Sequence, residues 1–97
     1  MKIKKYPFVV VRTFSAGVFA GYLKNRDGRE VNLVGAIRIW YWKGAASLSQ
    51  LAVEGVKCPA ECKFGVPADV ILTEAIEIIS TTAAAENAIK TVPSWRQ

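Results

Sequence analysis

Hydrophobic and polar residues alternate over the first 43 positions as they do in strands, in four runs rich in valine, isoleucine and aromatic residues. Asp27-Gly28 is a strong two-residue hairpin signal, and Gly35 permits another tight turn. The pattern therefore predicts a four-stranded antiparallel meander. Its strands are expected at residues 6–14, 18–26, 29–34 and 36–43.

The second half of the chain mixes helix and strand patterns. Ser47 and Gln50 have the spacing of a capping box, and Pro93 is expected to end the last helix. Trp95 lies in a short tail that is expected to fold back on the body. The elements predicted here are a short helix ending at Gly55, a loop at 56–68, a strand at 69–80 kinked at Thr73-Glu74, and a helix within 82–92. The predicted class is α+β, one antiparallel sheet with two short helices in a single domain over residues 1–97.

The amino-acid composition excludes some classes of protein. The 97 residues are 52% hydrophobic, which excludes a disordered tail and exceeds what one small core needs, so we expect a homo-oligomer. The longest uncharged run, residues 13–23, is too short to cross a bilayer. Segment 1–5 is basic, but no signal-peptide hydrophobic stretch follows it. We therefore expect a cytoplasmic protein that does not enter a membrane.

The charge is unevenly distributed along the chain. Residues 1–43 carry nine Lys/Arg and two acids, a net +7, whereas residues 44–97 carry four Lys/Arg and six acids, a net −2. A basic half attracts anions such as nucleotide phosphates, nucleic acids or acidic proteins. Lysines that protect edge strands from aggregation explain the same bias without any ligand.

The segment from Ala36 to Lys43 contains two of the three tryptophans. In a regular strand Ile37, Ile39 and Tyr41 would share a core face, and Arg38, Trp40 and Trp42 would share the other face. A cation beside two indoles suits stacking on a flat ring or packing against another subunit. The alternative is that both faces are buried, one of them under a helix.

Two loops add candidate anion-binding groups. After the first strand, Arg12, Ser15 and Gly17 combine a cation, a hydroxyl and the backbone amides of a small-residue turn. Lys43 precedes a glycine and the capped start of a helix, where anions are favoured. Plain turns explain both loops equally well. The candidate ligand-binding residues are Arg12, Ser15, Gly17, Arg38, Trp40, Trp42 and Lys43.

Residues for catalysis are scarce. The chain has no histidine, no phosphate-binding loop and no recognisable pair of carboxylates, so we expect a protein that is not an enzyme. Cys58 and Cys62 lack the further ligands that a zinc site needs, so neither a metal nor a cofactor is expected. Two free thiols in a loop are the expected state, with a disulfide as the alternative.

Three segments, 12–18, 38–45 and 72–78, together resemble a family of short tailed-phage and prophage proteins of unknown role. The distinctive part is the R-x-W-Y-W-x-G-A pattern that begins at Arg38, and the likeness extends from about Tyr6 to Trp95. The resemblance implies a viral setting in the bacterial host cytosol. Small phage proteins often counter host defence, and one strategy is an oligomeric sponge that traps nucleotide immune signals.

Three functions follow from these observations. The leading hypothesis is a phage-encoded homo-oligomeric sponge that sequesters an anionic, nucleotide-type signal such as a cyclic oligonucleotide. The second is a protein–protein interaction module or structural phage subunit that uses the tryptophan face to bind a host protein. The third is single-stranded nucleic-acid binding.

Overall fold

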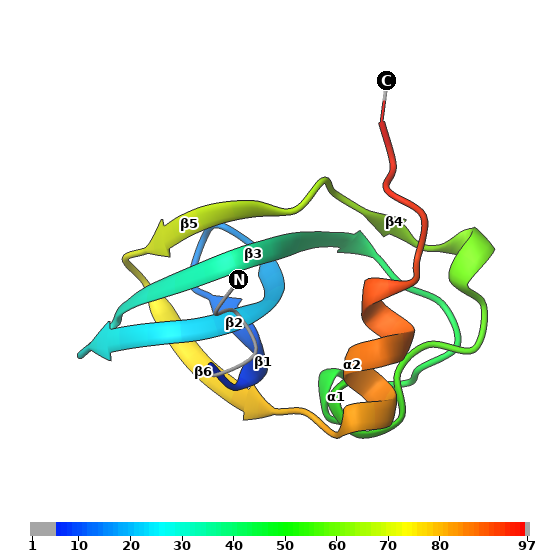
Figure 1. The fold of residues 1–97 in the computed structure, drawn as a ribbon, viewed down its shortest axis with the longest axis horizontal. Coiled ribbons are helices and arrows are strands. Elements are labelled where there is room, and N and C mark those ends of the chain that lie inside the picture. The colour runs from blue at the N-terminus through cyan, green and yellow to red at the C-terminus, as the bar shows by residue number, and fades with distance from the viewer. Residues whose placement is uncertain (1–5, 97) are drawn as a thin grey trace.

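The computed structural model describes residues 6–96 and confirms the α+β class, an antiparallel sheet with two helices packed against it (Figure 1). Segment 1–5, which includes three of the cations in the basic half, lies outside the described residues. The strands are β1 (Phe8–Thr13), β2 (Val18–Asp27), β3 (Glu30–Tyr41), β4 (Lys63–Phe64), β5 (Ala68–Leu72) and β6 (Ala75–Ser80). The helices are α1 (Leu48–Glu54), the short 3₁₀ helix η2 (Pro59–Glu61) and α2 (Ala83–Lys90).

The sheet curls into a partly open barrel. Its order is β4-β3-β2-β1-β6, and β5 also pairs with β3. Only Thr73 and Glu74 separate β5 from β6, although β5 pairs with β3 and β6 pairs with β1. The predicted strand at 69–80 is thus two strands with different partners, and the predicted kink at Thr73-Glu74 is the break between them. This break brings the two ends of the sheet toward each other (Figure 1).

The predicted turn at Gly35 is wrong. The expected third and fourth strands are one continuous strand, β3, and the N-terminal meander has three strands. Gly35 has a φ of +60°, so the glycine does adopt a conformation that other residues avoid. The chain does not reverse because residues on both sides of it keep pairing with β2: Leu33 pairs with Leu23, and Ile37 pairs with Ala20. The glycine accommodates a register irregularity instead of a turn.

Both faces of the sheet are buried, each in its own core. Alternate residues of β1 divide between the two cores, as strand geometry requires. Phe8 and Val10 face the core beneath the helices, together with Leu51 of α1 and Ile89 of α2. The second core fills the concave side of the sheet and contains Val9, Val11, Phe19, Val31, Leu33, Ala36, Leu72 and Ala75.

Local signals place both helices correctly. The Ser47 hydroxyl accepts a hydrogen bond from the backbone N–H of Gln50 at 3.1 Å, and Gly55 ends α1. Thr82 caps α2 in the same way. The expected return of Trp95 to the body is also confirmed, because its backbone N–H donates to the carbonyl oxygen of Phe64 at 2.8 Å. No helix within residues 6–96 is long and apolar enough to span a membrane.

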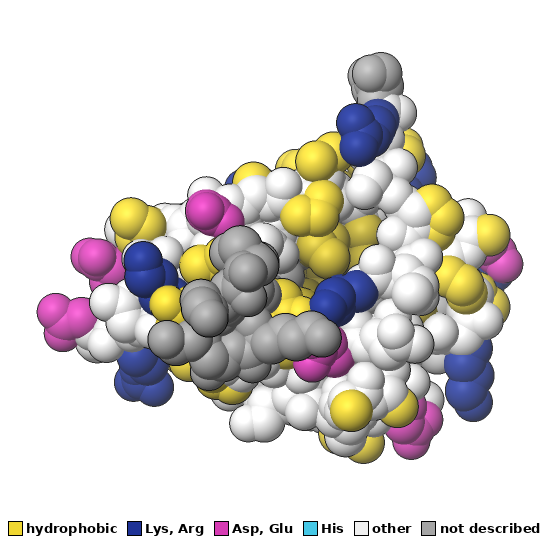
Figure 2. Space-filling model, in the orientation of Figure 1, with side chains coloured by type: hydrophobic (Ala, Val, Ile, Leu, Met, Phe, Trp, Pro, Cys, Tyr) yellow, Lys and Arg dark blue, Asp and Glu magenta, His cyan; other side chains and the backbone are white. Residues whose placement is uncertain are grey.

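Several large hydrophobic side chains remain exposed at the surface. They belong to neither core, so folding does not explain their presence. Figure 2 shows hydrophobic side chains at the surface around β3 and beside the C-terminal tail. The most exposed are Phe14 at 77%, Ile71 at 61% and Trp40 at 57%. Exposed aromatic and apolar groups that lie close together indicate an interaction site.

Candidate ligand-binding site

A cavity of about 260 Å³ lies between the β1–β2 turn, β3 and β5. Arg38 of β3 contributes its only cationic side chain, and Phe19 contributes an aromatic ring. We call this cavity the Arg38 pocket. Its lining is completed by Thr13, Ala16, Val70, Ile71, Leu72, Thr73 and Glu74. The pocket thus brings together residues that are up to 61 positions apart in the sequence.

Arg38 is held between two aromatic rings. Arg38 and Phe19 are cross-strand partners, and the guanidinium carbon lies 4.6 Å from the centre of the Phe19 ring. The same carbon lies 5.1 Å from the centre of the Trp40 ring. Among residues 6–96, Arg38 forms no ion pair with a carboxylate. Stacking therefore orients the guanidinium and leaves its N–H groups available to an anionic ligand.

The β1–β2 turn forms one wall of the pocket and is held by its own hydrogen bonds. The Thr13 hydroxyl donates to the carbonyl oxygen of Gly17 at 2.7 Å and accepts from the backbone N–H of Ala16 at 2.9 Å. The Ser15 hydroxyl donates to the carboxylate of Glu74. Because the Ser15 hydroxyl, the Ala16 N–H and the Gly17 carbonyl oxygen already have partners, these contacts favour the plain-turn interpretation of this loop. The turn shapes the pocket through Thr13 and Ala16.

Arg12 lies outside the residues that line the pocket. It is opposite Glu77 in the pairing of β1 with β6, and its Nε lies 2.9 Å from a carboxylate oxygen of that residue. Both side chains are nearly half exposed. An ion pair this open to water contributes little to stability, and it occupies the guanidinium that was expected to bind an anion. Arg12 thus provides a matched comparison for the unpaired Arg38.

The expected alignment of Arg38, Trp40 and Trp42 on one face is wrong for Trp42. Ile39 pairs with Phe64 and Tyr41 pairs with the preceding residue of β4, so β3 carries one extra residue, Trp40, at this point. This bulge shifts the alternation by one position. Trp42 consequently packs against the core beneath the helices, and its indole N–H donates to the Ala45 carbonyl at 3.2 Å. Tyr41, which was expected in the core, is 50% exposed.

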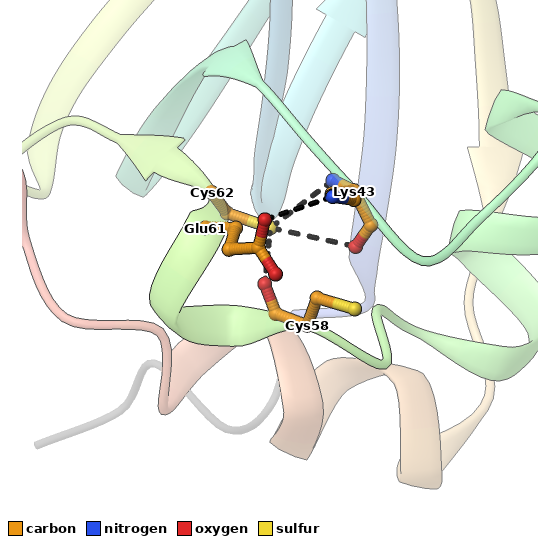
Figure 3. A network of polar contacts seen from close by, with 4 residues as sticks. All are labelled: Lys43, Cys58, Glu61 and Cys62. Carbon is orange, nitrogen blue, oxygen red and sulfur yellow. Dashed lines mark hydrogen bonds and ion pairs between the residues drawn. The ribbon is translucent and has the colours of Figure 1, made fainter.

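Lys43 belongs to a separate polar network with the loop that contains the cysteines (Figure 3). Its Nζ lies 2.8 Å from a carboxylate oxygen of Glu61, and this hydrogen bond raises the pKa of Lys43 above its ordinary value. Its backbone N–H donates to Sγ of Cys62 at 3.4 Å. Both cysteines carry free thiols, and Cys62 is buried in the core beneath the helices. Lys43 is therefore tied to this loop and does not line the Arg38 pocket.

Gly44 is required for this close approach of the two loops. It has a φ of +97°, and a Cβ at this position would lie 2.5 Å from the backbone nitrogen of Lys57. We predict that Gly44→Ala lowers the free energy of unfolding by about 2 kcal/mol, because backbone strain adds to the clash. Urea denaturation would measure the loss.

The matched control is Gly17→Ala. Gly17 has a similar φ of +100°, but a Cβ there meets no atom within 4 Å. This variant should lose about 1 kcal/mol, from backbone strain alone. Equal losses in the two variants would show that the contact between the loops does not constrain Gly44.

Sequence reasoning missed the walls of the pocket. Phe19 was assigned to a strand with no further role, and Ile71 was placed in a strand without a partner. The sequence did contain a signal for Ile71. The run Val70-Ile71-Leu72 has no polar residue, so if it forms an edge strand, one apolar side chain faces solvent. For Phe19 only its pairing opposite Arg38 reveals the role, and that pairing is absent from the sequence pattern.

The model of one protein family, described as Domain of unknown function (DUF6948), matches residues 6–89. The chain belongs to this family. Comparisons with curated proteins and with solved structures gave no match. The match covers both helices almost completely and all the strands, so the Arg38 pocket lies entirely within the family's domain.

Proposed function

We propose that this member of the DUF6948 family is a non-enzymatic binding protein that captures an anionic ligand with a flat ring, of the nucleotide type, at the Arg38 pocket. One observation carries the proposal: Arg38 is stacked between Phe19 and Trp40 and forms no ion pair among residues 6–96. A guanidinium pairs with phosphate through two parallel hydrogen bonds. The exposed face of Trp40 supplies a surface on which a base stacks.

The size of the pocket suits part of such a ligand. Pockets that enclose a whole small molecule have volumes of about 300–1,000 Å³. The Arg38 pocket, at about 260 Å³, admits a single ring or a short apolar group and leaves the remainder of the ligand on the surface. Val70 and Leu72, which pack with the second core, offer an apolar wall for the inserted group.

The resemblance to tailed-phage and prophage proteins supports a biological role for capture. We propose that the protein acts in the bacterial host cytosol as a sponge, which removes a nucleotide immune signal such as a cyclic oligonucleotide without converting it. The absence of histidine from the sequence fits sequestration better than turnover. A sponge of this kind requires only high affinity and abundant copies.

The test is calorimetric titration with a panel of cyclic di- and trinucleotides. Arg38→Ala should weaken binding roughly 10- to 100-fold, since a hydrogen bond to a charged group contributes about 1.5–3 kcal/mol. Arg12→Ala removes the same charge from an exposed ion pair and should weaken binding less than about threefold. Equal losses in both variants would point to general charge attraction and contradict a specific role of Arg38.

A second candidate function is protein binding through the same face. The observation that favours it is the exposure of Phe14 and Ile71, which belong to the turn and strand that border the pocket. If the wild type binds no member of the panel, the nucleotide proposal fails. Binding of a host protein that is lost in both Phe14→Ser and Ile71→Ser would then establish this second function.

We also propose that the protein forms a dimer or a larger even-numbered oligomer, which would cover part of this exposed apolar surface. Sedimentation at tens of micromolar should give a mass that is an even multiple of 10.6 kDa. Ile71→Glu should shift the protein toward the monomer, because it would bury a charge at the contact. A wild-type protein that sediments as a 10.6 kDa monomer would contradict this proposal.

A further inference from the structure

A second cation lies over an aromatic ring beside the Arg38 pocket. The Nζ of Lys63, in β4, is 5.2 Å from the centre of the Trp95 ring. Trp95 is held there by its backbone, which donates to the carbonyl oxygen of Phe64 at 2.8 Å, and by a bridge between Ser94 and Phe64. The tail thus lies along β4 and presents Trp95 with 41% of its surface exposed.

The strand register places this second contact on the same side of the sheet as Trp40. Lys63 is the cross-strand partner of Tyr41, and paired residues point to the same face. The next residue, Phe64, points to the opposite side and is buried beneath the helices. The Lys63 side chain is therefore on the side of the sheet away from the helices, where Trp40 and Tyr41 are also exposed.

The two cation–aromatic contacts are separated by little more than the width of β4. Gly65 joins them, because its N–H donates to the Arg38 carbonyl at 2.8 Å and a Cβ on it would lie 3.7 Å from Nε1 of Trp40. The backbones of β3, β4 and the tail are neighbours, so the backbones that carry Trp40 and Trp95 are two strand spacings, about 10 Å, apart. Because Gly65 has no side chain, nothing projects from this position beside the Trp40 ring.

The two cations of this surface form no ion pair within the described part of the chain, and the carboxylate of Glu74, which also lines the Arg38 pocket, accepts a hydrogen bond from Ser15. Within residues 6–96, the ion pairs involve Arg12, Lys43 and Lys90, and neither Arg38 nor Lys63 forms one. Three partly exposed rings, those of Trp40, Tyr41 and Trp95, accompany the two cations. Alternating cations and aromatic rings match a ligand in which phosphates alternate with bases.

We infer that Lys63 and Trp95 form a second nucleotide subsite, and that the ligand is an oligonucleotide of at least two bases. The inference rests on the proposed function and extends it. One base stacks on Trp40 with a phosphate on Arg38, and the next base stacks on Trp95 with a phosphate near Lys63. Cyclic and linear oligonucleotides share this chemistry, and the experiment distinguishes them.

The test compares adenosine monophosphate, linear diadenylate and cyclic di-adenosine monophosphate by calorimetric titration. The wild type should bind at least one dinucleotide about tenfold or more tightly than the mononucleotide. Trp95→Ala should weaken dinucleotide binding about 5- to 100-fold, the range for loss of one stacked base, and change mononucleotide binding less than twofold. Trp95→Phe should retain most of the affinity because it keeps a ring. The tighter of the two dinucleotides identifies the ligand as cyclic or linear.

Charge at the second subsite is tested separately. Lys63→Ala should reduce the salt dependence of dinucleotide binding by about one released counterion. Lys57→Ala removes an exposed lysine of the cysteine-containing loop and should leave the salt dependence unchanged.

Equal effects of Trp95→Ala on mononucleotide and dinucleotide binding would show that the tail acts only through the fold and would overturn the inference. So would equal affinity of the wild type for all three ligands. Absence of binding to any of them would instead overturn the proposed function itself.

Discussion

Trp42→Ala should lower the free energy of unfolding by about 3 kcal/mol, whereas Trp40→Ala should leave the folded protein almost as stable as the wild type. The two residues are chemically identical and two positions apart, but they lie in different surroundings. Trp42 packs against the core beneath the helices and donates its indole N–H to Ala45. Truncating a buried aromatic residue costs about 3–5 kcal/mol, and partial burial places Trp42 at the lower end.

Trp40 has 57% of its surface exposed, so its truncation removes little packing. Its expected effect is on binding, where loss of one stacked base corresponds to about 1–3 kcal/mol. Urea denaturation of both variants, combined with titration of the folded Trp40→Ala protein, would separate stability from affinity. If Trp40→Ala destabilised the protein as much as Trp42→Ala, the bulge in β3 would not divide the two indoles as described.

Phe64→Ala is expected to have the largest effect on stability, a loss of about 3–5 kcal/mol. Phe64 is 1% exposed and lies in the core beneath the helices, at the crossing of β4 with the C-terminal tail. A loss of this size is a large share of the total stability of a small domain, about 5–15 kcal/mol. The variant should therefore unfold at much lower urea concentration.

Phe14→Ala is the matched control for this prediction. The same side chain is 77% exposed at position 14, so its removal should change the free energy of unfolding by less than about 0.5 kcal/mol. Thermal denaturation of both variants would check the contrast. A similar loss in Phe14→Ala would mean that the protomer contact proposed around Ile71 extends over Phe14 and buries it.

Signals that act over a few residues predicted the helices and, to within one residue, the hairpin between β2 and β3. Ser47 caps α1 and Thr82 caps α2 because each side chain needs only a backbone N–H three residues further along the chain. Gly28 and Arg29 connect β2 to β3, one residue later than the Asp27-Gly28 signal indicated, and Gly28 has a φ of +61°. Such features are determined by neighbours in the sequence, so the sequence reveals them.

Local signals gave wrong or incomplete predictions where the structure depends on pairing with distant strands. Gly35 adopts a positive φ, which a residue without a side chain allows. Pairing with β2 continues on both sides of it and keeps β3 extended. The sequence pattern predicted the kink at Thr73-Glu74 but not its consequence for strand pairing. That consequence, pairing of β5 with β3 and of β6 with β1, depends on partner residues separated by more than thirty positions.

The sequence by itself determined the α+β class, the cap at Ser47, and the placement of an arginine beside aromatic residues near the end of one strand, but not whether those aromatic residues are exposed. Tertiary structure alone decided which tryptophan joined that arginine, because one extra residue opposite β4 moved Trp42 into the core. It also assembled the Arg38 pocket from the β1–β2 turn, β3 and β5. The physical reason is that side-chain direction alternates residue by residue, so a single bulge or a nonlocal strand pairing reverses what a local pattern implies.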